Sequence, residues 1–130
     1  MNLQIAILFW SLVLFETKHF VCDFVLQTRY QKQGKGIYGH PGGLIHAGLH
    51  AVGSLPAILL LTLSPLLIAA LVVAEFAVHY HIDWLKLAIL RRRALLPEGA
   101  LYWVVFGADQ FLHQMNYVIF LAVLVRAMAV

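Results

Sequence analysis

Four apolar segments, each with roughly the 20 residues that a helix needs to cross a bilayer, take up most of this chain of 130 residues. Hydrophobic residues make up 62% of it and charged residues 12%. Soluble domains have roughly 45–50% apolar and about 25% charged residues. The composition, with a mean hydropathy of +0.85, therefore predicts an all-α integral membrane protein.

The chain has room for one domain, residues 1–130, whose connections are marked by Gly, Pro and basic residues. The expected spans are residues 2–27, 43–63, 65–90 and 101–128. We expect these four helices to pack as a transmembrane four-helix bundle. The first is expected to be retained as a span, because no basic residues precede its apolar run.

Basic residues gather in the connections after the first and third spans, which share one side of the membrane because two spans separate them. These connections contain Arg29, Lys32, Lys35 and residues 91–93, while the other side has only Arg126. The positive-inside rule then places both termini outside. We therefore interpret the net charge of +3 as orienting a multi-pass protein in a bacterial inner membrane, not as binding nucleic acid.

Every expected span carries two ionisable residues four positions apart. The pairs are His19 and Asp23, His46 and His50, His79 and Asp83, and Asp109 and His113. On a helix this spacing places both side chains on one face, one turn apart. Because ionisable groups inside a membrane are energetically expensive, four such pairs indicate a shared polar site.

The pairs are expected at similar depths when residues are counted inward from the cytoplasmic end of each span. At 1.5 Å per residue, Asp23, His50, Asp83 and Asp109 lie about 9–12 Å deep. His19, His79 and His113 lie about 15–18 Å deep, and His46 lies about 5 Å deep, at the mouth. The outer halves of the second and third spans contain no ionisable residue, which favours a pocket on one side over a pore.

Imidazole and carboxylate groups are typical ligands of Zn, Mn or Fe, and bundles that present them on facing helices build metal sites. We predict that the eight paired residues bind one or two divalent transition metal ions. Glu75 or Glu16, both deeper in the bundle, is a candidate general base or an outer partner of the ligands. Gln27, Lys86 and Gln110 are candidates for orienting substrate or ligands.

These motifs resemble a family of small bacterial membrane proteins, domain of unknown function 3307. The matching stretches are His19-x3-Asp23-Phe24-x-Leu26-Gln27-Thr28, His46, His79-x3-Asp83-x2-Lys86 and Asp109-Gln110-x2-His113. Lys35 matches a loop lysine of the family. The resemblance implies a membrane protein and no particular reaction. The pattern is also similar in style to membrane-bound metal-dependent hydrolases with histidine-rich spans.

Three functions are compatible with this pattern. The leading hypothesis is a metal-dependent hydrolase acting on a phosphate-containing or lipid substrate at the cytoplasmic leaflet, where basic residues could attract an anion. Stacked acids and histidines could instead conduct protons or divalent metal ions. A structural subunit with a buried polar layer is the third. Membrane lipids are the expected partners, and small residues on the second span would allow a homo-oligomer.

Overall fold

The computed structural model describes residues 2–128, and helices are the only regular secondary structure among them, which confirms the all-α prediction. The helices in chain order are α1 Leu3–Phe20, the π-helical η1 Val21–Val25, α2 Arg29–Gly34, α3 Pro41–Gly53, α4 Leu55–Leu59, α5 Pro65–Arg92 and α6 Ala100–Met128. The long helices begin within two residues of the expected spans. The second expected span is divided at Ser54 into α3 and α4.

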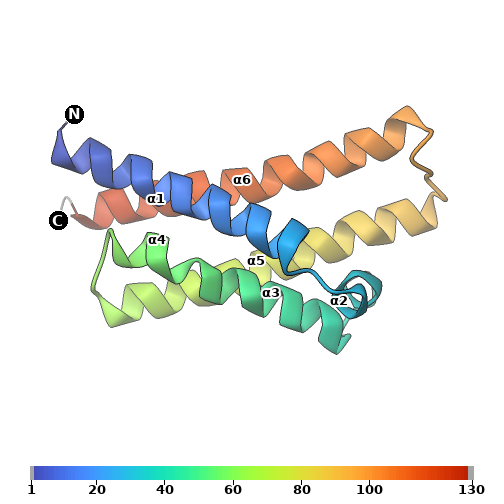
Figure 1. The fold of residues 1–130 in the computed structure, drawn as a ribbon, viewed down its shortest axis with the longest axis horizontal. Coiled ribbons are helices and arrows are strands. Elements are labelled where there is room, and N and C mark those ends of the chain that lie inside the picture. Colours follow the sequence, from blue (N-terminus) through green and yellow to red (C-terminus); the bar gives the residue numbers. More distant parts are fainter. Residues whose placement is uncertain (1, 129–130) are drawn as a thin grey trace.

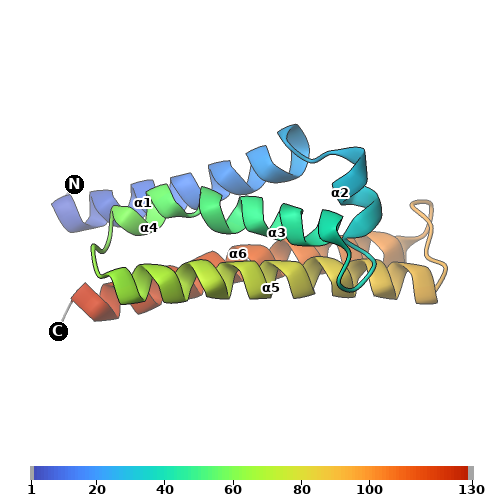
Figure 2. The ribbon, with the colours of Figure 1, turned by 90° about the horizontal axis from the view of Figure 1, so that it is seen from below.

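The long helices run roughly parallel or antiparallel to one another (Figures 1 and 2). Both termini lie at the same end of the molecule, together with the α4–α5 connection. Helix α2 and the α5–α6 connection lie toward the opposite end, and α5 and α6 extend there beyond the start of α3. The helix ends therefore do not lie in one plane.

Within the described part of the chain, three stretches are long and apolar enough to cross a membrane: Leu3–Val25, Pro41–Leu59 and Pro65–Arg92. They correspond to the first three expected spans. Helix α6 has the length, with 29 residues, but polar residues from Asp109 to Asn116 interrupt its apolar sequence. The structure thus agrees with a membrane protein and leaves the fourth span as a prediction.

The connection after η1, expected as a loop, contains the short helix α2. Thr28 and Gln31 form a capping box, in which each side chain bonds to the backbone of the other residue. A Cβ at Gly42 would lie 2.6 Å from the Tyr30 carbonyl oxygen, so a glycine here allows α2 to approach α3. The Arg91 guanidinium donates to the Gly36 carbonyl and ties this connection to α5. The result is a fixed position for Lys35, directly after α2.

The interior has an apolar part and a polar part. The apolar part surrounds α4 and contains Phe15, Ala57, Ile58, Leu61, Leu71, Tyr117, Phe120 and Leu124. Large apolar side chains such as Leu63 and Leu66 are more than 80% exposed, as expected of surfaces that face lipid. The polar part lies toward α2 and contains the paired residues found in the sequence. This division supports the prediction of a polar site on one side.

Candidate metal centre

The four pairs converge on one buried cluster formed by α1–η1, α3, α5 and α6. All eight side chains are no more than 9% exposed, with His19 at 8% and Asp23 at 9% the most open. The imidazole rings stack: the ring centroids of His50 and His79 are 3.6 Å apart, and those of His79 and His113 are 4.2 Å apart. The structure thus brings the four predicted pairs together in one buried cluster.

Three subsets of the cluster bring possible ligand atoms within 4.8 Å of one another. They are Asp23, His46, His50 and His79; His19, His79 and His113; and Asp83, Asp109 and His113. Together they include all eight predicted ligands. His79 and His113 each belong to two subsets, so the three cannot all be filled independently.

Asp23 lies in the π-helical turn η1, where the first expected span departs from regular α-helix. Such turns are rare and often occur at functional sites. One Asp23 oxygen lies 3.0 Å from His46 Nε2 and 3.4 Å from His50 Nε2. The other lies 3.2 Å from His19 Nε2. This single carboxylate is therefore surrounded by three imidazoles from two helices.

The expected position of His46 at the pocket mouth is wrong. Its side chain is 1% exposed, and its Nε2 lies 3.0 Å from Asp23 and 3.1 Å from Asp83. His50 lies one turn deeper, stacked on His79. The depth count assumed that all helices end at one level, whereas α5 extends beyond the start of α3 (Figure 2). The second span is thus shifted by about one turn relative to the prediction.

Three lysines, Lys18, Lys35 and Lys86, are also buried in or beside the cluster. Lys35 Nζ lies 3.1 Å from Asp83, and Lys86 Nζ lies 2.7 Å from Asp109 and 3.2 Å from Asp83. Lys86 is only 9% exposed and completes this ion-pair network. Among the described residues, no lysine lies within 4.0 Å of Asp23.

Several buried histidine nitrogens and carboxylate oxygens of the cluster lie close to one another without forming hydrogen bonds. Across residues 2–128, those without a hydrogen-bond partner include His19 Nε2, His50 Nε2, His79 Nδ1, His113 Nε2, Asp83 Oδ2 and Asp109 Oδ1. Buried polar atoms are normally paired, and each exception calls for an explanation. Nitrogen and oxygen atoms that converge without bonding one another are what a cation site requires, so the donor set fits a divalent metal ion.

Glu75 occupies the inner side of the cluster, where it accepts hydrogen bonds from Lys18, Asn116 and Tyr117. Tyr117 also bonds to His19 Nδ1 at 2.9 Å. Sequence reasoning missed Lys18 and Tyr117 and singled out Glu16, which is only half-buried and forms no ion pair within the described chain. The signal would have been a lysine within the first expected span and a glutamate within the third, since each is energetically expensive inside a membrane.

A small pocket of about 80 Å³ leads from the α2 end of the molecule to Asp23. Its other lining residues are Phe24, Gln27, Lys35, Lys86, Phe106 and Gln110. Gln27 Nε2 lies 3.3 Å from His46, and Gln110 Nε2 donates to Asp109 at 2.9 Å. Gln27, Lys86 and Gln110 therefore lie together at this pocket. Glu75 does not line it.

Fold and site together define a helical protein with apolar helices of membrane-spanning length and a buried histidine–carboxylate cluster that could hold a metal ion. The chain belongs to the family described as protein of unknown function (DUF3307), whose model matches residues 9–130. This confirms the resemblance drawn from the sequence motifs. A search of curated proteins and a search of solved structures each found no match.

Proposed function

We propose that this chain is an integral membrane metalloprotein that binds one divalent transition metal ion, Zn²⁺, Mn²⁺ or Fe²⁺, through Asp23, His46, His50 and His79. The observation that carries the proposal is the pairing of charges. Glu75, Asp83 and Asp109 each meet a lysine, whereas Asp23, among the described residues, meets three imidazoles and the neutral Gln27 amide but no lysine. A carboxylate without a cation is costly inside a membrane, and a metal ion would supply that cation.

We propose further that the centre is a metal-dependent hydrolase for a phosphate-containing substrate. A divalent metal ion supplies Lewis acidity and activates water when bound. Lys35 and Lys86 line the pocket that reaches Asp23, and an ammonium group can donate hydrogen bonds to several oxygens at once. Gln27 and Gln110 add amide donors at the same opening. These groups favour an anionic oxygen-rich group over a neutral one.

Hydrolysis adds the elements of water across a phosphorus–oxygen ester bond. The water oxygen bonds to phosphorus, the bond to the alcohol oxygen breaks, and one water proton ends on the alcohol. Asp23 is the carboxylate that lines the pocket and is placed to hold that proton in transit. We assign Glu75 a positioning role, because its oxygens bond to Lys18, Asn116 and Tyr117.

The proposed protein has four spans, with α6 as the fourth and both termini outside. Support comes from the common location of the two termini in Figure 1 and from the turning of Asp109, His113 and Asn116 into the interior. At 1.5 Å per residue, α6 is long enough to cross a bilayer. The apolar interior around α4 argues against a continuous polar path through one chain.

Elemental analysis of protein purified without affinity-metal steps tests the metal centre, and hydrolysis of p-nitrophenyl phosphate with added Zn²⁺, Mn²⁺ or Fe²⁺ tests the reaction. We expect bound metal in the wild-type protein and chelator-sensitive hydrolysis. Asp23→Asn should lose both, whereas Glu16→Gln, which neutralises a carboxylate on the adjoining helix α1, should keep both. Metal-free protein whose stability is unaffected by chelator would refute the centre; bound metal without hydrolysis would refute only the reaction.

A further inference from the structure

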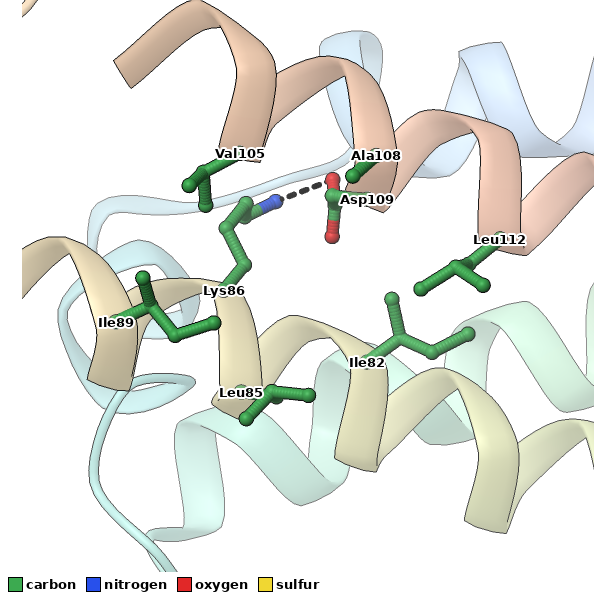
Figure 3. A pocket seen from close by; sticks show the side chains of 8 residues that line it. All are labelled: Ile82, Leu85, Lys86, Ile89, Val105, Ala108, Asp109 and Leu112. Carbon is green, nitrogen blue, oxygen red and sulfur yellow. Dashed lines mark hydrogen bonds and ion pairs between the residues drawn. The ribbon is translucent and has the colours of Figure 1, made fainter. Parts of the chain in front are cut away.

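A second pocket opens between α5 and α6, on the outer surface of the molecule. It has a volume of about 100 Å³, and Figure 3 shows the side chains that line it. Six of the eight are hydrocarbon: Ile82, Leu85 and Ile89 from α5, and Val105, Ala108 and Leu112 from α6. We call this pocket the α5–α6 groove. Leu85 and Leu112 are 48% and 45% exposed, so its rim lies on the lipid-facing surface.

The remaining two lining residues are Lys86 and Asp109, which form an ion pair of 2.7 Å between the two helices (Figure 3). Lys86 also lines the polar pocket that reaches Asp23. An apolar groove and a polar pocket therefore meet at one ammonium group. A soluble anion would use only the polar pocket, whereas an amphiphile would use both.

We infer that the substrate is a membrane lipid with a phosphate headgroup, which enters sideways from the bilayer. The phosphate binds in the polar pocket against Lys86 and Lys35, and the adjacent part of the hydrocarbon chain lies in the α5–α6 groove. The rest of the hydrocarbon chain stays in the bilayer that surrounds α5 and α6. This assignment rests on the proposed function for the headgroup and adds the lipid nature of the substrate.

Equilibrium lipid binding tests this inference without any turnover. Native mass spectrometry of the detergent-purified full chain would compare phosphatidic acid, phosphatidylcholine with the same chains, and glycerol phosphate. Phosphatidic acid should bind at least about tenfold more tightly than glycerol phosphate, because burial of two methylene groups is worth that much. It should also bind more tightly than phosphatidylcholine, whose headgroup carries a compensating positive charge.

Variants that fill the α5–α6 groove test whether the hydrocarbon chain of the lipid lies in it. Ala108→Phe should weaken phosphatidic acid binding by about tenfold and leave glycerol phosphate binding unchanged. Leu85→Trp, at the rim, should act in the same way if the first variant folds poorly. Ala69→Phe is the matched control, because Ala69 is exposed on α5 about 20 Å from Ile82 along the helix axis.

The inference would be overturned by wild-type affinity for phosphatidic acid in both groove variants, or by equal binding of phosphatidic acid and glycerol phosphate. Equal binding of phosphatidylcholine would mean ordinary lipid contact and would also overturn it. Metal content is measured on the same samples. A groove variant that loses lipid binding but keeps its full metal content shows an effect on the groove alone. Absence of metal from the wild-type protein would instead count against the proposed metal centre.

Discussion

Replacing Asp23 by asparagine tests the metal centre at its most specific point. The side chain keeps its size and one carbonyl oxygen but loses the negative charge that no lysine neutralises. Removing an outer partner of a metal ligand typically costs about 10–100-fold in affinity, and we expect a direct ligand to reach at least the upper end, about 100-fold. That factor corresponds to about 2.8 kcal/mol of binding free energy.

The same change has a calculable effect on stability. With free metal at 100 times the wild-type dissociation constant, binding stabilises the folded protein by about 2.7 kcal/mol. A 100-fold weaker variant at the same metal concentration gains only about 0.4 kcal/mol. Thermal unfolding in detergent, with and without metal, should therefore show a large metal-dependent increase for the wild-type protein and almost none for Asp23→Asn.

Glu16→Gln provides the matched control, since Glu16 lies on α1 two turns from Asp23 and is only half-buried. It should retain the full metal-dependent stabilisation. Competition with a chromogenic chelator would give the affinities directly. If Asp23→Asn binds metal as tightly as the wild-type protein, the charge-pairing reasoning is refuted, even if the protein contains a metal elsewhere.

Four further outcomes follow from the same geometry. Glu75→Gln leaves the Lys18 ammonium buried beside a neutral group and should destabilise the protein by about 3–5 kcal/mol, measured by thermal unfolding in detergent. Lys35→Met should keep the metal but weaken inhibition by inorganic phosphate about tenfold, because a hydrogen bond from a charged group is lost. Acidification from about pH 8 to about pH 5 should release the metal, because imidazole ligands must be neutral to bind; metal content after dialysis checks this. In a Cys22→Ala background, a membrane-impermeant thiol reagent should label Gln33→Cys from the cytoplasm and Ser64→Cys from outside; the reverse pattern would invert the topology.

Much of the site could be predicted because ionisable side chains inside apolar helices carry a high energetic cost. Each ionisable pair interrupts an apolar run, and helical periodicity fixes which side chains share a face. Antiparallel neighbours then bring the pairs together without any knowledge of the loops. The convergence of the four pairs needed only these two regularities, and the structure agrees with it.

The errors arose where the prediction depended on how helices are aligned along their axes. His46 was placed at the mouth because each span was counted from its own end, and sequence gives no measure of how far α5 extends beyond α3. The fixed position of Lys35 was missed for a similar reason, since it depends on α2 folding back onto α3 and α5. Lys18 was overlooked because its partner, Glu75, is 57 residues away in the chain.

The buried charges also bear on how many ions the centre holds. Four carboxylates and three lysines are buried or nearly so, which leaves one net negative charge when the imidazoles are neutral. One divalent ion changes this to one positive charge, whereas two ions would give three positive charges in a medium that penalises each of them. A second ion at Asp83, Asp109 and His113 would also have to displace Lys35 or Lys86 from their carboxylates. We therefore expect about one metal ion per chain, and a measured ratio of two would show that the lysines leave the cluster when metal binds.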